Sequence, residues 1–439
     1  MPSTPPPARN PFRPPAPGGG SIREVIKVHP MTLTRRSALT TVAAAAALPL
    51  IRPARAQKPV IKIGVLNDQS GPYTNTGGRT SVICTQQALE DFGAAAKGLN
   101  VEVISADHQN KPDLAVSIVR QWFDRDGVDV LLDVPTSSVA LALQSVVREK
   151  NKVYLNSGAA SSALTGAQCS PNFVHWTYDT YMLAKSTGGA MVKAGGDSWY
   201  FVTADYAFGK QLQSDTTSFV TAAGGKVLGS ALYPFPGTTD FSSFLVQAQS
   251  SGAKVIGLAN AGGDTVNSIK QANEFGLNNS MKIAALLMFI TDVHALGLGV
   301  AHGLNLTESF YWDLNDRTRA FTKRVLPKTP TNYPNMDHAG CYSATFHYLK
   351  AVADMGAAEA KKDGVATVNR MKAMPVDDDC FGKTKIREDG RNLVPSFLFE
   401  VKKPSESKGP WDYYKLVVET PGNEAFRPLA DGHCAFVKA

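Results

Sequence analysis

Two loops rich in hydroxyl side chains are the segments of this sequence best suited to bind a small anion. Thr136-Ser137-Ser138 follows an apolar stretch at residues 127–134, and residues 157–162 read Ser-Gly-Ala-Ala-Ser-Ser. A helical pattern begins at residue 137, so the hydroxyls of the first loop are expected to cap that helix while backbone N–H groups point outward. Such N–H groups bind a carboxylate without a basic side chain. For either loop alone, capping without a ligand is the alternative.

The sequence contains no motif typical of an enzyme. Neither G-x-S-x-G nor H-E-x-x-H occurs, and the glycines at 297, 299 and 303 are spaced one residue too widely for a dinucleotide fingerprint. The acidic run at residues 377–379 lacks the alternating spacing of a metal loop and is expected to be a solvated loop. We therefore expect no catalytic residue, no cofactor and no metal.

Five cysteines are widely separated and form no C-x-x-C pair, so a zinc or redox site is not expected. They are Cys84, Cys169, Cys341, Cys380 and Cys434. One or two disulfides could form, with at least one thiol left over, and buried free cysteines are the alternative. The pairing cannot be chosen from the sequence.

Strand and helix patterns alternate along most of the chain. Strands are expected at residues 59–66, 101–105, 127–134 and 153–156, with helices at 79–92, 112–122 and 137–150 between them. The pattern restarts after residue 178, with strands at 198–203, 226–232, 254–258 and 281–287 and helices at 183–194, 209–223, 241–250 and 264–275. Such alternation implies parallel sheets covered on both faces.

The last third of the chain follows both of these units. It is expected to contain a strand at residues 303–310, helices at 315–325 and 338–355, and an irregular C-terminal segment. The sequence thus predicts an α/β protein with two doubly wound lobes and a chain that crosses between them more than once.

The charge distribution argues against a nucleic-acid partner. The first 56 residues contain eight basic residues and one acidic residue, whereas the whole chain has 45 basic and 38 acidic residues. The remaining 383 residues are therefore neutral, and no basic footprint for phosphate is expected. The longest apolar run outside the leader, residues 283–290, is too short to span a bilayer.

The first 56 residues have the pattern of an export leader. Residues 1–30 are rich in proline and are expected to be disordered. Arg35 and Arg36 then precede an Ala-rich apolar stretch at residues 41–51, and Ala54-Arg55-Ala56 is a small-x-small cleavage site. Together these features predict a twin-arginine signal peptide cleaved after Ala56 and a periplasmic protein. A membrane anchor is the alternative.

Several short motifs, in this order and spacing, resemble the periplasmic leucine/isoleucine/valine-binding protein family. They are residues 61–66 (IKIGVL), 70–72 (SGP), 127–138 (GVDVLLDVPTSS), 156–165 (NSGAASSALT), 205–209 (DYAFG), 239–241 (TDF) and 389–391 (DGR). The resemblance covers essentially all of residues 58–400. Its members are the solute receptors of ABC importers.

The resemblance implies the type I periplasmic binding protein fold, in which two Rossmann-like lobes are joined by three hinge crossovers. It places residues 58–178 and 308–392 in the first lobe and residues 179–307 and 393–439 in the second. It also implies a monomer that presents a small-molecule ligand to an ABC permease of the inner membrane. A ligand sensor of the same fold and an exported hydrolase are the alternatives.

The resemblance, together with the loop chemistry, selects a set of candidate ligand-binding residues. They are Tyr73, Thr76, Pro135, Thr136, Ser137, Ser157, Gly158, Ala159, Ala160, Ser161, Tyr206, Phe208, Gly262, Asp264 and Phe289. Family members that bind amino acids hold the ammonium group with a tyrosine and a glutamate, and the matching regions here read Ala261-Gly262 and Met288-Phe289. Burying an unpaired ammonium is unfavourable. We therefore expect a carboxylate ligand without an α-amine: an aromatic, keto or hydroxy acid.

Overall fold

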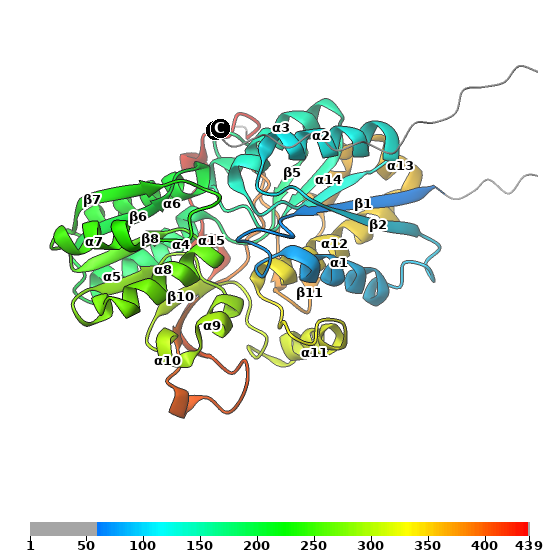
Figure 1. Ribbon diagram of the computed structural model, residues 1–439. Helices are drawn as coiled ribbons and strands as arrows, with labels where there is room; N and C mark the ends of the chain where they lie inside the picture. Colours follow the sequence, from blue (N-terminus) through cyan, green and yellow to red (C-terminus); the bar gives the residue numbers. More distant parts are fainter. Residues whose placement is uncertain (1–58, 438–439) are drawn as a thin grey trace, which may run out of the picture. The chain divides into compact units, whose positions relative to one another are not determined.

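The computed structural model describes residues 59–437, and the predicted export leader lies outside them. Figure 1 shows two α/β lobes, one containing β1 to β5 and the other β6 to β9. The first parallel sheet has the order β2 (Asn100–Asp107), β1 (Val60–Asn67), β3 (Val130–Asp133), β4 (Val153–Asn156), β5 (Phe173–His175). The second has the order β7 (Lys226–Tyr233), β6 (Ser198–Ala204), β8 (Val255–Ala259), β9 (Lys282–Ala285).

Helices cover both faces of these sheets. In the first lobe they are α1 (Gly78–Phe92), α2 (Pro112–Gln121), α3 (Ser137–Glu149), α11 (Asp316–Val325), α12 (Met336–Met355), α13 (Ala357–Lys362) and α14 (Gly364–Ala373). In the second they are α4 (Thr180–Leu183), α5 (Gly189–Lys193), α6 (Ala207–Ala222), α7 (Ser242–Ser250), α8 (Gly263–Glu274), α9 (Ile290–Leu296) and α10 (Leu298–Ala301). Every residue of β3, β4 and β8 is buried, which explains why these strands read as continuous apolar runs.

The sequence predicted an irregular C-terminal segment, and this prediction is wrong. The segment forms part of a third sheet. β13 (Ser396–Val401) pairs antiparallel with both β10 (Asn305–Glu308) and β14 (Tyr414–Thr420). β14 is largely exposed and lacks an alternating pattern, so only its pairing with distant strands defines it. The short helix α15 (Gly422–Ala425) follows.

Two further predictions need correction. The helix expected at residues 183–194 is divided into α4, a π-helical turn at Ala184–Gly188 and α5. The acidic run is not a solvated loop: its first two residues lie in β11 (Val376–Asp378), which pairs with β12 (Gly382–Thr384), and Asp378 is buried. The side chain of Ser343 donates to Asp378 at 2.6 Å.

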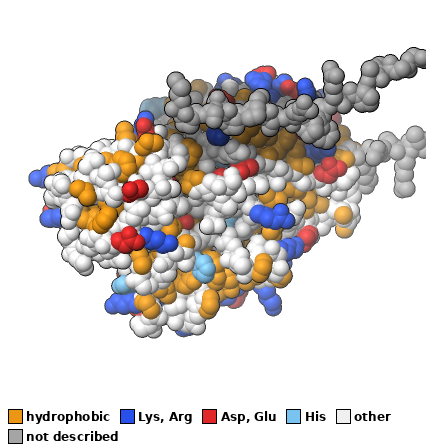
Figure 2. All heavy atoms as spheres, in the orientation of Figure 1, with side chains coloured by type: hydrophobic (Ala, Val, Ile, Leu, Met, Phe, Trp, Pro, Cys, Tyr) orange, Lys and Arg blue, Asp and Glu red, His pale blue; other side chains and the backbone are white. Residues whose placement is uncertain are grey.

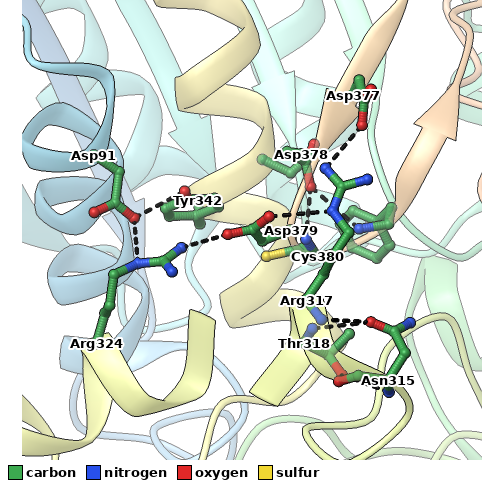
Figure 3. A network of polar contacts seen from close by, with 12 residues as sticks. Asp91, Asn315, Arg317, Thr318, Arg324, Tyr342, Asp377, Asp378, Asp379 and Cys380 are labelled. Atoms are coloured by element: carbon green, nitrogen blue, oxygen red, sulfur yellow. Dashed lines mark hydrogen bonds and ion pairs between the residues drawn. The ribbon is translucent and has the colours of Figure 1, made fainter. Parts of the chain in front are cut away.

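Ion pairs attach α11 to the rest of the first lobe (Figure 3). Arg324 bridges Asp91 of α1 and Asp379, each at 2.8 Å. Arg317, two turns earlier, contacts Asp377 at 2.8 Å and Asp379 at 3.2 Å. Asp377 and Asp379 of the acidic run therefore hold α11 against the first lobe.

The chain passes between the lobes after β5, after β10 and after β12. The first and third crossovers lie side by side, because His175 N–H donates to Gly390 and Asn392 N–H donates to His175. Arg391 is fully buried between them, where its guanidinium donates to the Thr177 carbonyl and pairs with Asp179 at 3.2 Å. This buried cation ties the two crossovers together.

Glu308, at the second crossover, joins groups from both lobes. Its carboxylate accepts the N–H groups that begin α9 (Ile290, 2.9 Å) and α12 (Met336, 3.2 Å) and the Tyr414 hydroxyl (2.7 Å). Burial raises the pKa of Glu308 from 4.5 to about 8. Between these two pKa values, the Glu308 carboxyl group stays protonated in the folded protein, whereas it is ionised in the unfolded chain.

One disulfide forms, between Cys169 and Cys434, and Cys84, Cys341 and Cys380 are buried free thiols. The bond joins the loop before β5 to the C-terminal segment, 265 residues apart in sequence. It therefore fixes the end of the chain to the first lobe.

We predict that Cys434→Ser lowers the free energy of unfolding by about 2–5 kcal/mol, because it removes this long-range cross-link. In the denatured wild-type protein, a thiol reagent should react with three cysteines before reduction and all five after it. Cys434→Ser should expose one additional thiol without reduction. As a control, Cys380→Ser should remove one reactive thiol and leave the disulfide intact. Five reactive thiols without reduction would contradict the assignment.

A second prediction concerns pH. Between the unfolded pKa of 4.5 and the folded value of about 8, the free energy of unfolding should fall as pH rises, because the folded state binds the extra proton. The slope from this one group is at most about 1.4 kcal/mol per pH unit. Urea unfolding across this window should show a shallower slope for Glu308→Gln, whereas Glu102→Gln, at an exposed glutamate, should match the wild type. An unchanged slope for Glu308→Gln would contradict the prediction.

Candidate ligand-binding site between the lobes

A small cavity that is partly open to solvent lies between the two lobes. Its lining comes from loops that follow strands of both parallel sheets. The lining residues are Tyr73, Thr76, Pro135, Gly158, Ala160, Tyr178, Tyr206, Phe208, Ala261, Leu287 and Phe289.

The strand order explains why these loops meet. In both parallel sheets the loops after the strands emerge at the carboxyl edge, and a crevice opens where the strand order reverses. That reversal lies between β1 and β3 in the first sheet and between β6 and β8 in the second. Tyr73 and Pro135 follow β1 and β3, whereas Tyr206 and Ala261 follow β6 and β8. The cavity therefore lies at the switch points of both sheets.

The lining is aromatic and uncharged. Five of the eleven residues are tyrosine or phenylalanine, and none of the eleven carries a carboxylate, ammonium or guanidinium group. Burial raises the pKa of Tyr73, Tyr178 and Tyr206, so all three hydroxyls are neutral donors at physiological pH. The Tyr178 hydroxyl donates to the Gly158 carbonyl at 2.6 Å. Such a wall suits a flat or branched apolar group.

Two backbone N–H groups of residues that line the cavity are without a protein acceptor. The N–H groups of Gly158 and Ala160 have no hydrogen-bond partner among the described residues, although both residues line the cavity. Their carbonyl groups are already used: Tyr178 donates to Gly158, and the Thr180 N–H donates to Ala160. Within the described residues, this loop therefore has two backbone donors without a protein acceptor, whereas the corresponding carbonyl groups are occupied.

The strand end that carries Pro135 is strained. Asp133 and Val134 have φ angles of +78° and +61°, a conformation that a β-branched residue such as valine rarely adopts. The side-chain amide of Asn156 donates to both carbonyls, at 2.8 Å to Asp133 and 3.0 Å to Val134. This clamp holds the backbone in the conformation that places Pro135 against Gly158.

Neither nearby carboxylate of the second lobe replaces the missing ammonium partner. Asp264 accepts the Tyr233 hydroxyl at 2.8 Å, and Asp292 accepts the Phe289 N–H at 3.0 Å. Burial raises the pKa of Asp264 to about 6 and that of Asp292 to about 7. Both carboxyl groups are thus partnered within the second lobe, and neither lines the cavity.

The lobes contact each other beside the cavity. The Gly263 N–H donates to the Pro72 carbonyl at 2.9 Å, and the Tyr73 and Tyr206 hydroxyls are 2.5 Å apart. Phe235 stacks on both tyrosine rings, with centroid distances of 5.5 Å to Tyr73 and 4.2 Å to Tyr206. This is a closed arrangement in which aromatic rings cover the cavity.

Eight of the fifteen residues predicted from the sequence line this cavity, and seven lie outside its lining. The eight are Tyr73, Thr76, Pro135, Gly158, Ala160, Tyr206, Phe208 and Phe289. The seven are Thr136, Ser137, Ser157, Ala159, Ser161, Gly262 and Asp264. Ligand contact by any of the fifteen stays a prediction.

The serine and threonine side chains bind other parts of the protein. No hydroxyl caps α3, contrary to the expectation: Thr136 donates to the side chain of Asn110, and Ser137 accepts the Ser161 N–H at 3.2 Å. Ser157 donates to the Asp337 carbonyl at 2.7 Å. These hydroxyls support the loops, and the backbone of the second loop faces the cavity.

Sequence reasoning missed three lining residues: Tyr178, Ala261 and Leu287. Tyr178 lies at the boundary assigned between the lobes, where a linker and not a wall of the site was expected. Ala261 and Leu287 carry no chemical signal of their own. Tyr178 lies three residues after β5, a strand that the sequence analysis did not predict, so no signal in the sequence identified it.

On the face shown in Figure 2, basic and acidic side chains are interspersed, without a continuous patch of one sign. Of the helices between residues 59 and 437, none combines the length and the apolar character needed to cross a bilayer.

Comparison with known proteins points in one direction. The family model described as periplasmic binding protein matches residues 60–409. A periplasmic binding protein from Burkholderia mallei is 48% identical, with 86% of this chain and 99% of that chain covered and a TM-score of 0.82. A branched-chain amino acid ABC transporter periplasmic ligand-binding protein from Burkholderia xenovorans is 38% identical, with the same coverage and a TM-score of 0.74.

A more distant relative is Leu/Ile/Val-binding protein homolog 4 from Brucella abortus, which is 25% identical over 247 residues. The match covers 53% of this chain and 58% of the Brucella protein, so it spans little more than half of each.

The interlobe contact at Gly262 generates a testable prediction. Gly262 has φ +58°, and a Cβ there would lie 2.6 Å from the Pro72 carbonyl oxygen of the other lobe. Gly262→Ala should therefore destabilise the closed arrangement and weaken the affinity for whichever solute stabilises the protein by at least about tenfold. Calorimetric titration measures this effect. Gly189→Ala, where a Cβ meets no atom within 4 Å, is the matched control. Equal affinities for the two variants would contradict the prediction.

Proposed function

Because this chain belongs to the periplasmic binding protein family, of the leucine/isoleucine/valine-binding type, we propose that it captures a small carboxylate for an ABC importer. The proposed ligand is an aromatic, keto or hydroxy acid that lacks an α-amino group. Export by the twin-arginine leader, cleavage after Ala56 and a monomeric state belong to the same proposal.

The observation that carries the proposal is the pairing of unused N–H groups with an uncharged aromatic wall. A carboxylate can accept from Gly158 and Ala160, while its apolar part packs against Tyr206, Phe208 and Phe289. An ammonium group would find no free carboxylate in the lining. Taking that charge out of water without a partner costs several kcal/mol. The site therefore favours the keto acid over the amino acid of the same carbon skeleton.

Binding in this proposal is a conformational equilibrium and no bond is made or broken. Loops of both lobes line the cavity, so a ligand makes its full set of contacts only when the lobes are closed. Its differential affinity shifts the equilibrium toward the closed form, which is the form presented to the permease. The three crossovers, with Arg391 and Glu308 at their centre, are the hinge about which the lobes would move.

Matched pairs of acids test the ligand class most directly. We expect phenylpyruvate and 4-methyl-2-oxopentanoate to raise the thermal stability of the purified protein, and phenylalanine and leucine to leave it unchanged. At 100 times its dissociation constant a ligand adds about 2.7 kcal/mol. The affinities within each pair should differ by at least about 100-fold, which corresponds to about 2.7 kcal/mol.

Two controls make the screen decisive. Benzamide, the neutral counterpart of benzoate, should bind much more weakly than benzoate if the carboxylate is held by the N–H groups. Phe208→Ala should weaken aromatic acids more than aliphatic ones, because it removes one ring of the wall. Equal binding of leucine and its keto acid would refute the amine-free ligand. Loss of uptake of the bound acid on deletion of the gene would separate transport from sensing.

A further inference from the structure

Three buried side chains that the proposed function does not use converge behind Gly158 of the cavity lining. Asp133 ends β3, and Asp337 and Cys341 lie one turn apart on α12, at the i, i+4 spacing that places two side chains on one helix face. One ligand atom from each of the three lies within 4.8 Å of the others. All three residues are fully buried.

These carboxylates lack the partners that buried charges require. Both carboxylate oxygens of Asp337 and one of Asp133 have no hydrogen-bond partner, and neither residue forms an ion pair among the described residues. The other Asp133 oxygen accepts the side-chain amide of Asn67 at 2.9 Å. Two unpaired ionised carboxylates in the interior are strongly unfavourable, so this cluster must either hold a proton or bind a cation.

Ser81 supplies an independent sign of a binding site. It belongs to α1, is fully buried, and its hydroxyl has no partner among residues 59–437. A Cβ placed on Gly77 would be 3.6 Å from this hydroxyl and 3.4 Å from one oxygen each of Asp133 and Asp337. The hydroxyl and both carboxylates therefore lie around one region beside Gly77.

We infer that Asp133, Asp337 and Cys341 bind one divalent cation of the zinc type, with the Ser81 hydroxyl beside it. A thiolate together with carboxylates suits zinc, which takes sulfur and oxygen ligands in a four-coordinate site. Calcium and magnesium are bound by oxygen ligands alone, so Cys341 disfavours them. The cation would replace the missing counter-charge and join β3, α1 and α12.

The position of this site connects it to the cavity. A Cβ on Gly158, a lining residue, would come within 2.9 Å of an Asp337 oxygen. The cation would therefore lie next to the loop that carries the Gly158 and Ala160 N–H groups and would fix the position of that loop. The metal site itself rests on the buried side chains alone and does not depend on the identity of the solute.

Metal analysis of the untagged, exported protein tests the inference. After growth with zinc and extensive dialysis, mass spectrometry should find about one zinc per chain. Exchange for Co²⁺ should produce a thiolate-to-cobalt charge-transfer band in the near ultraviolet. Cys341→Ser should abolish that band, and Asp337→Asn should reduce the zinc content severalfold. Cys380→Ser, at a buried free cysteine outside the cluster, is the matched control and should behave as the wild type.

The wild-type spectrum alone can overturn the inference, so the test does not depend on any variant folding. Substoichiometric zinc and no thiolate band would show that the two carboxyl groups neutralise each other by sharing a proton. Bound zinc without the band would exclude Cys341 as a ligand and overturn the assignment of this cluster. Either result leaves the ligand screen unaffected, because that screen reports binding of organic acids in the cavity above.

Discussion

The structure depends on a property of parallel sheets: every strand delivers its following loop to the same edge. Helices return the chain to the opposite edge each time, so the loops after β1, β3, β4, β6, β8 and β9 gather without any local signal that brings them together. Because two such edges face each other, a cavity forms from backbone and aromatic groups that are far apart in sequence. Beside this cavity the N–H groups of Gly158 and Ala160 have no acceptor among the described residues, which is the basis of the proposed carboxylate ligand.

Closure of two lobes requires that the connection between them stay ordered while they move. At the crossovers, the connecting segments are held together by two buried polar groups, the Arg391 guanidinium and the Glu308 carboxyl group. Arg391 joins the first and third crossovers through Thr177 and Asp179, and Glu308 receives the N-termini of helices from both lobes. An unpartnered charge in such a position is strongly unfavourable, so only arrangements that satisfy these groups are populated.

The cavity lining and the buried cluster of Asp133, Asp337 and Cys341 differ in their electrostatic character. The lining itself carries no charged side chain, which is why we propose a ligand without an ammonium group. The carboxyl groups of Asp133 and Asp337 lie one layer deeper, where both approach Gly77 and Asp337 also approaches the lining residue Gly158. Strain at Asp133 and Val134, held by Asn156, is located where these two layers meet. The strained backbone, the lining residue Pro135 and the buried carboxyl group of Asp133 are therefore all found at the end of β3.

The sequence by itself determined the type and order of most elements and the segments that form the site. Local periodicity and turn residues report burial, so β4 and α3 were located to within a residue and the serine-rich loops were placed after buried strands. Only the tertiary structure decided which atoms of those loops face the cavity, and it turned the hydroxyls of Ser137 and Ser157 toward the protein. It also chose the Cys169–Cys434 pair, built the third sheet from β10, β13 and β14, and brought Asp133 to Asp337. All of these contacts join residues far apart in the chain, and local patterns carry no information about such pairings.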